Sequence, residues 1–91
     1  MNYDLLGRVM TLVLEDDYYE DRTIGGARNS ILSALRHNRC FIHRDGGEVV
    51  GYCTWGFFTR EEIDTDLWVG DEVFSRKEGI LYFPKFQCRA G

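Results

Sequence analysis

The chain has 91 residues, of which 44% are hydrophobic, 14% aromatic and 29% charged, and its net charge is −4. This composition excludes a disordered tail, because disorder requires low hydrophobicity and high net charge, and it predicts a single domain over residues 1–91. A core of this size leaves little spare stability for a deep cleft with strained groups, which weighs against a complete enzyme.

The apolar run nearest the N-terminus is too short to span a membrane. It covers Val9–Leu14 and is followed directly by acidic residues. A helix that spans a membrane needs about 20 apolar residues. A signal peptide has basic residues before its apolar run and a small-residue cleavage site after it. Here Asp4 precedes the run and acidic residues follow it, so we expect a cytoplasmic protein without membrane contacts. The odd number of cysteines predicts core thiols in a reducing compartment. They are Cys40, Cys53 and Cys88.

Two amphipathic helices are predicted first. Apolar residues recur at spacings of three and four over residues 4–15, which predicts the first helix. A second stripe follows Thr23, whose hydroxyl we expect to cap the first turn of a helix that ends near Asn38. The pair Gly25–Gly26 lowers helix propensity and predicts a start later than the stripe suggests.

A β-hairpin is predicted next. Aromatic and β-branched residues dominate 39–44 and 48–58, and the turn Asp45–Gly47 between them holds two glycines that tolerate positive φ. A glycine inside a strand often marks a bulge, so we expect bulges at Gly51 and Gly56.

The remaining residues predict a short helix and short strands. Thr59 and Glu62 have the spacing of a capping box at a helix start. Short strands are expected at 73–74 and 80–83, and Pro84 should interrupt further pairing. This order predicts an α+β fold, in which an antiparallel sheet with a central hairpin packs against the N-terminal helices.

Several short motifs, taken in order, resemble the RTX toxin-activating lysine acyltransferases, a family with a fold like that of the GNAT acetyltransferases. The motifs are Leu32–Arg36, Arg44–Asp45, Tyr52–Trp55, Trp68–Asp71 and Gly79–Phe86. The resemblance spans residues from about Leu5 to Phe86, nearly the whole chain, and corresponds to the N-terminal half of a family member. The resemblance therefore implies a fragment of the GNAT-like fold.

The same resemblance implies transfer of a fatty acyl group from acyl carrier protein to a protein lysine, carried out by a His and an Asp. The matching positions hold Tyr19 and Ile80 instead. A base for lysine needs a pKa near the working pH, which His supplies and Tyr, at about 10, does not. We therefore expect the chemistry to be lost. If activity remains, Tyr19 or Glu20 would lie near the reacting amine and Glu78 would be the orienting carboxylate.

One group of side chains has the residue types of a zinc site. His37, Cys40 and His43 could ligate zinc by type, but the alternation of a strand places Cys40 and His43 on opposite faces. Cys53 would need an adjacent His to act as a nucleophile, and the expected hairpin register places it on the other face from His43. We therefore expect a buried thiol at Cys53 and no metal or other cofactor.

Two acidic runs hold most of the fifteen Asp and Glu residues. Three aromatic residues lie inside them, a composition typical of protein-binding hot spots, although a solvated surface is the plain alternative. Rows of carboxylates complement a basic groove, including one that normally holds nucleic acid, and the same charge disfavours direct binding of DNA or RNA. The residues expected to bind a partner are Asp16, Asp17, Tyr18, Tyr19, Glu20, Asp21, Glu61, Glu62, Asp64, Asp66 and Trp68.

The leading hypothesis is a non-catalytic, acyltransferase-like protein that binds a protein partner with a basic surface. An inhibitor from a phage or mobile element, directed at a nucleic-acid-handling defence complex of the host, fits the size and the charge. Two alternatives stay open. One is a minimal lysine acyltransferase that uses acyl carrier protein. The other is a homodimeric structural module, since the core is small for Phe57, Phe58, Phe83 and Phe86.

Overall fold

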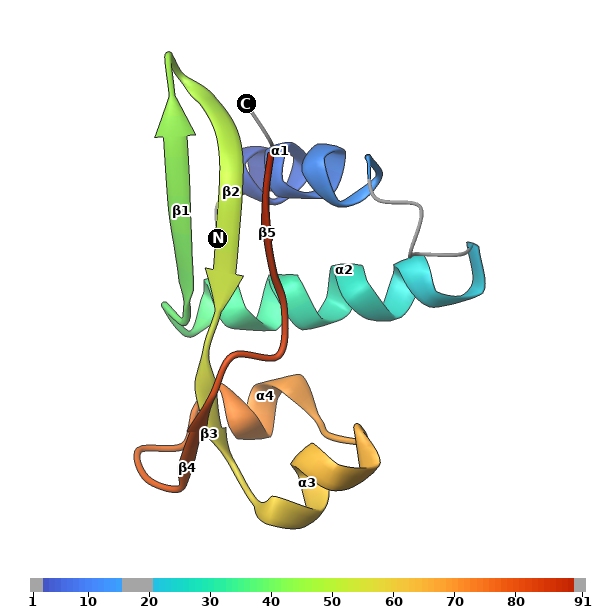
Figure 1. Cartoon of the computed structure of the whole chain (residues 1–91), viewed down its shortest axis with the longest axis vertical. Coiled ribbons are helices and arrows are strands. Elements are labelled where there is room, and N and C mark those ends of the chain that lie inside the picture. Colours follow the sequence, from blue (N-terminus) through green and yellow to red (C-terminus); the bar gives the residue numbers. More distant parts are fainter. Residues whose placement is uncertain (1–2, 16–20, 90–91) are drawn as a thin grey trace.

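The computed structural model describes residues 3–15 and 21–89, and Figure 1 shows N-terminal helices packed beside a small antiparallel sheet. Helix α1 spans Tyr3–Val13 and helix α2 spans Asp21–Arg36. Both predicted helices are therefore confirmed. Among the residues described, no helix has the length and apolar character needed to cross a membrane.

The start of α2 differs from the prediction. The helix begins at Asp21, so Thr23 lies inside its first turn and is not the N-cap, and the expected late start is wrong. The helix runs through Gly25–Gly26, because its next turns bury Ala27 and Ile31 in the core. Tertiary burial of an amphipathic face supplies more stability than helix propensity does.

The predicted hairpin is confirmed. Strand β1 spans Cys40–Asp45, strand β2 spans Glu48–Thr54, and the two pair antiparallel. The turn between them is Gly46–Gly47, where φ is 58° and 88°. Both values lie in the left-handed region that glycine adopts without a steric cost. A tight turn of this kind matches the twist of the flanking strands.

The hairpin register contains one irregularity. His43 pairs with Gly51 and Arg44 pairs with Val49, so Val50 is an additional residue on β2. The bulge expected at Gly51 therefore lies one residue earlier. An additional residue turns every side chain beyond it to the other face of the sheet.

The strand that begins as β2 changes sheets after Thr54. Strand β3 spans Gly56–Phe58 and pairs with β4 at Ile80–Tyr82. The predicted bulge at Gly56 is instead the first residue of β3. A side chain there would collide with α4, because a Cβ on Gly56 would lie 2.8 Å from the Val73 carbonyl oxygen.

Pairing resumes after Pro84, against the prediction. Strand β5 spans Phe86–Cys88 and pairs with β2, which gives a three-stranded sheet in the order β1-β2-β5. The two sheets are joined where the Thr54 amide donates to the Lys85 carbonyl, with N and O 2.8 Å apart. Pro84 lies in the bend between β4 and β5, where it needs no ladder hydrogen bond.

Two short helices lie between β3 and β4 along the chain. Helix α3 spans Arg60–Thr65 and starts with the predicted capping box, in which Thr59 and Glu62 bond each other's backbone amides. Helix α4 spans Gly70–Val73. The strand predicted at 73–74 is therefore wrong, because this apolar pair is buried at the end of a helix.

The core has two parts. The first lies between α1, α2 and the inner face of the β1-β2-β5 sheet, and the second lies between α2, β3 and α4. The buried members of the first are Leu6, Val9, Leu12, Val13, Ile31, Val49 and Tyr52. Those of the second are Ala34, Phe58, Val73 and Phe74. This arrangement of helices on an antiparallel sheet confirms the α+β fold.

Candidate functional site

The second acidic run forms α3, α4 and the chain between them. We call residues 61–72 the acidic segment, and Figure 1 places it at the far end of the molecule from α1. Three of its predicted binding residues, Glu61, Asp64 and Asp66, are exposed. Asp66 ends α3 with a left-handed φ of 56°, which turns the chain sharply out of the helix.

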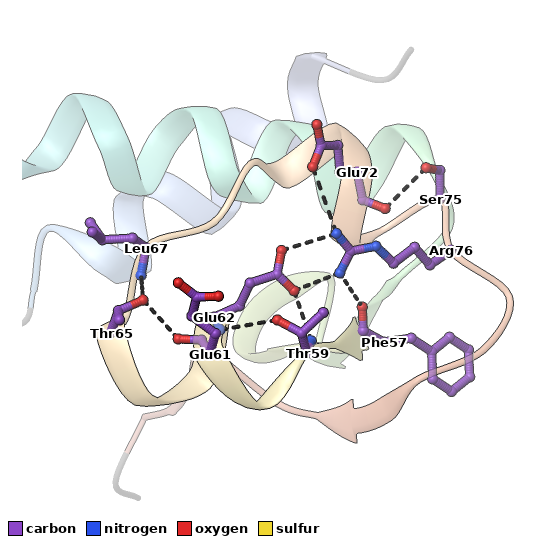
Figure 2. Close-up of polar contacts among 9 residues, drawn as sticks. All are labelled: Phe57, Thr59, Glu61, Glu62, Thr65, Leu67, Glu72, Ser75 and Arg76. Atoms are coloured by element: carbon purple, nitrogen blue, oxygen red, sulfur yellow. Dashed lines mark hydrogen bonds and ion pairs between the residues drawn. The ribbon is translucent and has the colours of Figure 1, made fainter.

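Two large apolar side chains are exposed inside the acidic segment. Leu67 is 75% exposed and Val69 is 57% exposed. The chain here is fixed by local bonds, because the Leu67 amide donates to Thr65 Oγ1 at 3.3 Å and Thr65 Oγ1 donates to the Glu61 carbonyl at 2.8 Å. Figure 2 shows both bonds and shows the Leu67 side chain pointing away from them.

We call these two apolar side chains, with the exposed carboxylates closest to them in the sequence, the Leu67 patch. Its members are Glu61, Asp64, Asp66, Leu67 and Val69. An apolar centre with a polar rim is the usual anatomy of a protein interface. The sequence analysis predicted the carboxylates as binding residues but missed Leu67 and Val69. Two aliphatic residues inside the acidic segment were the sequence feature that indicated them.

Glu62 is held inside the molecule. Its Oε2 accepts from Arg76 Nη2 at 3.0 Å, and Arg76 Nη1 also donates to the Phe57 carbonyl at 3.3 Å (Figure 2). Hydrogen bonds from Arg76 and from the Thr59 amide lower the pKa of Glu62 to about 2. Glu62 therefore has a structural role here, and binding by its side chain stays a prediction.

Trp68 and Asp71 connect the acidic segment to the rest of the fold. The Trp68 ring packs edge-on against Phe58, with centroids 5.3 Å apart, so Trp68 belongs largely to the core. The Asp71 carboxylate accepts from Arg36 Nη1 at 3.3 Å and lies 3.3 Å from His37 Nε2. The pKa of Asp71 is lowered, first by a hydrogen bond from the Ser33 hydroxyl. These contacts attach α4 to the end of α2.

A cavity of about 400 Å³ lies between α2 and the acidic segment. One wall is the face of α2 that carries small residues, and the other is the chain from Asp66 to Asp71. Lys85, from the bend between β4 and β5, also lines it. The cavity was not expected from the sequence.

The first acidic run cannot be placed in this site. Asp16, Asp17, Tyr18, Tyr19 and Glu20 lie outside the described residues. Asp21 is the first residue of α2, and only its backbone is described.

Ile80, which the resemblance assigns to the position of the family's Asp, lies on a strand in the structure. Ile80 is the first residue of β4 and is 38% exposed. Glu78, the nearby carboxylate, is exposed in the turn before β4. Tyr19 lies outside the described residues, so the loss of the catalytic His and Asp stays a prediction.

The cysteine and histidine predictions are corrected in two respects. Cys88 is exposed and Cys40 and Cys53 are only partly buried, so the expectation of three core thiols is wrong. Phe41 pairs with Cys53 and His43 pairs with Gly51, so Cys53 and His43 share one face of the sheet. The predicted opposite placement is wrong, because the additional residue at Val50 shifts the register by one. Burial raises the pKa of Cys53, which disfavours the thiolate that a nucleophile needs. Within residues 3–15 and 21–89, no group of three metal-ligating side chains is arranged to hold an ion.

The homodimer was predicted from four phenylalanines, and these differ in how far they are exposed. Phe58 is buried and Phe57 is partly buried, whereas Phe83 and Phe86 are exposed. Exposed Phe86 lies beside Cys53 on the outer face of the sheet, on the same face as Phe41. The homodimer stays a prediction.

Comparison with known proteins identifies the family. The sequence model that describes the RTX toxin acyltransferase family matches residues 1–79 of the chain. The chain belongs to this family, which agrees with the ordered motifs in the sequence. A search among curated proteins finds no significant match.

Proposed function

We propose that this protein acts by binding another protein through the Leu67 patch, without catalysing acyl transfer. The observation that carries the proposal is the exposure of Leu67 and Val69 among the carboxylates of Glu61, Asp64 and Asp66. Burial of two aliphatic side chains supplies affinity, and the carboxylates favour a partner whose contact surface is basic around an apolar centre. In this proposal the partner is a cytoplasmic protein.

The finer form of the proposal names the kind of partner. A row of carboxylates can take the place of phosphates on a basic groove, so a protein that handles nucleic acid is a suitable target. The chain would then inhibit that protein by occupying the groove, as an inhibitor from a phage or mobile element does when it blocks a defence complex. Competition between the chain and nucleic acid for one partner is the expected signature.

The experiment is a capture from bacterial lysate, with and without nuclease, read by quantitative mass spectrometry. The variant combines Leu67→Ser and Val69→Ser, which replace the two apolar side chains of the Leu67 patch by small polar ones. The matched control is Leu81→Ser, since Leu81 is 53% exposed but lies on β4, outside the patch. A protein retained by the wild type and by the control, and lost with the double variant, supports the proposal.

Family membership supports a second candidate, a lysine acyltransferase that uses acyl carrier protein. In this case Tyr19 or Glu20 would lie near the reacting amine, with Glu78 as the orienting carboxylate. Capture of acyl carrier protein would favour this candidate, as would an acyl mass increase on a partner lysine that is lost when Tyr19→Phe and Glu20→Gln are combined. Binding without any mass increase favours the first proposal.

A further inference from the structure

The face of the β1-β2-β5 sheet that is turned away from α1 and α2 carries large exposed apolar side chains. Helices α1 and α2 cover the inner face (Figure 1). On the other face, Phe41 is 62% exposed and Phe86 is 72% exposed. The pairing of the strands places six residues on this outer sheet face, in two rows that run across the strands. They are Phe41, Cys53 and Phe86 in the first row, and His43, Gly51 and Cys88 in the second.

The first row projects from the sheet and the second is recessed. The Phe86 and Phe41 rings belong to the first row. In the second row Gly51 has no side chain, and a Cβ there would lie 3.5 Å from His43 Cβ and 3.6 Å from Cys88 Cα. These neighbours therefore form the walls of a recess whose floor is Gly51. The recess has a volume of about 240 Å³, and Phe41 is among the residues that line it whereas Phe86 is not.

One wall of this recess is held in place by the rest of the fold. The Phe41 ring stacks on Trp55, with centroids 6.1 Å apart and an angle of 16° between the ring planes. The Trp55 amide donates to the Arg39 carbonyl at 2.9 Å, and the Arg39 guanidinium lies 4.2 Å from the Trp55 ring centroid. The wall is therefore positioned before anything binds, which lowers the cost of ordering an interface.

A projecting ring and a recess on the same face make that face complementary to itself. Phe86 pairs with Cys53, and Gly51 lies two residues from Cys53 on the same strand, so the ring and the recess are diagonal neighbours. A two-fold axis between two copies that bisects the line from ring to recess brings each ring over the recess of the other copy. This reciprocal contact is the pattern of an isologous dimer.

Charge also favours a second copy at this place. The chain has a net charge of −4, so two copies repel each other wherever their acidic residues meet. None of the six residues of the outer sheet face is Asp, Glu, Lys or Arg. The acidic segment forms α3 and α4, outside this sheet. Two chains of the same sign can therefore approach at the outer sheet face with little repulsion.

The two exposed rings are large enough for the apolar centre of a small interface. A buried aromatic side chain removes about 150–250 Å² from water, so the exposed fractions of Phe41 and Phe86 amount to roughly 270 Å² per copy. A standard interface buries about 800 Å² per partner, and much of it is polar rim. We therefore expect a dimer that forms in a concentration-dependent way.

We infer that the chain forms a symmetric homodimer through the outer sheet face, in which Phe86 of each copy occupies the Gly51 recess of the other. A second copy suits this face better than a different protein does, because the ring and the recess that would receive it belong to the same surface. This inference goes beyond the proposed function, since the Leu67 patch takes no part in the contact.

The test is sedimentation velocity of the whole chain from about 1 to 300 µM, with a reducing agent that prevents disulfides at Cys88. The mass should rise from the 10.6 kDa of the monomer toward twice that value. In a mixture of isotope-labelled and unlabelled chains, filtered NOE spectra should connect the Phe86 ring of one copy to Gly51 of the other. A mass of 10.6 kDa at every concentration, or a dimer without this contact, would overturn the inference.

Variants of exposed residues test the ring and the recess separately. Phe86→Thr removes the ring but keeps a residue suited to a strand, and it should weaken dimerisation at least tenfold. Cys88→Glu places a carboxylate in each recess and should have the same effect. Both positions are exposed, so circular dichroism should show folded chains. Leu67→Ser is the matched control, because Leu67 is 75% exposed but lies outside this face, and it should dimerise like the wild type. Dimerisation of wild-type strength in folded Phe86→Thr or Cys88→Glu would overturn the inference.

The Cys88 thiol reports the same contact chemically. It is exposed in the single chain and lines the recess. Its alkylation should therefore slow as the protein concentration rises and the recess is covered. A rate that is independent of protein concentration would contradict the dimer.

The dimer and the proposed function can fail separately. Phe86→Thr should lose the dimer and still capture the protein partner, whereas the double variant at Leu67 and Val69 should lose the partner and still dimerise. Dimerisation without any captured protein leaves only the proposed function in error. Capture by a chain that stays monomeric leaves only the dimer in error.

Discussion

The Arg76 guanidinium closes on the Glu62 carboxylate, with Nη2 and Oε2 3.0 Å apart, and so ties the chain after α4 to the first turn of α3. Arg76 also contacts Glu72, with Nη2 and Oε2 3.6 Å apart. The same Glu62 side chain caps α3 through the Thr59 amide at 2.8 Å. One carboxylate thus fixes both ends of the acidic segment and orients the loop that presents Leu67.

Glu62→Gln should lower the free energy of unfolding at neutral pH by about 1 kcal/mol, because glutamine can still cap α3 but loses the charged bond to Arg76. The pKa of Glu62 is about 2 in the folded chain against an ordinary 4.5. Its contribution is therefore complete above pH 4.5 and is lost as the pH falls toward about 2.

Urea unfolding over this pH range measures that dependence. The difference between wild type and Glu62→Gln should shrink steadily with acidification, while Glu61→Gln, at an exposed neighbour, should match wild type throughout. A difference that stays constant with pH would show that the ion pair does not form.

Gly56→Ala should destabilise the fold by about 2 kcal/mol, because overpacking against rigid backbone typically costs about 1–3 kcal/mol. The added Cβ would lie 2.8 Å from the Val73 carbonyl oxygen and 3.1 Å from a Phe74 ring carbon. Gly26→Ala is the matched control, since its Cβ meets nothing within 4 Å, and it should stabilise α2 by about 0.5–1 kcal/mol. Denaturant midpoints read both changes, and equal shifts in the two variants would refute the close approach of β3 and α4.

The three thiols should react with iodoacetamide at different rates. Burial raises the pKa of Cys40 to about 12, and it also raises the pKa of Cys53, so both hold little thiolate near pH 8. Cys88 is exposed and free. Peptide mapping after timed alkylation should find Cys88 modified first and Cys40 last. Modification of Cys40 as fast as Cys88 would mean that β1 opens readily.

Local signals in the sequence were enough for the elements whose cause is local. The capping box at Thr59 and Glu62 needs only four consecutive residues, and the Gly46–Gly47 turn needs only two positions with positive φ. Both predictions are confirmed. The apolar pair Val73–Phe74 looks like a strand, but its conformation is decided by burial against Phe58 and Ala34, which are distant in sequence.

Features set by distant contacts could not be read from the sequence. The additional residue at Val50 reverses the predicted faces of Cys53 and His43. Gly51 indicates a bulge nearby, but the local pattern does not give the residue at which the register shifts. The exposure of Leu67 depends on the neighbouring Trp68 taking the core position beside Phe58. The cavity depends on Lys85 reaching α2 through a bend whose pairing was not predicted.

The central claim is that the Leu67 patch binds a protein, and the most direct measurement is the affinity of the chain for its captured partner over a range of salt concentrations. The double variant Leu67→Ser and Val69→Ser should weaken binding at least tenfold at every salt concentration, since apolar burial is not screened. Replacing Glu61, Asp64 and Asp66 by their amides should instead flatten the salt dependence. Equal affinity of the wild type and the double variant at all salt concentrations would contradict the account.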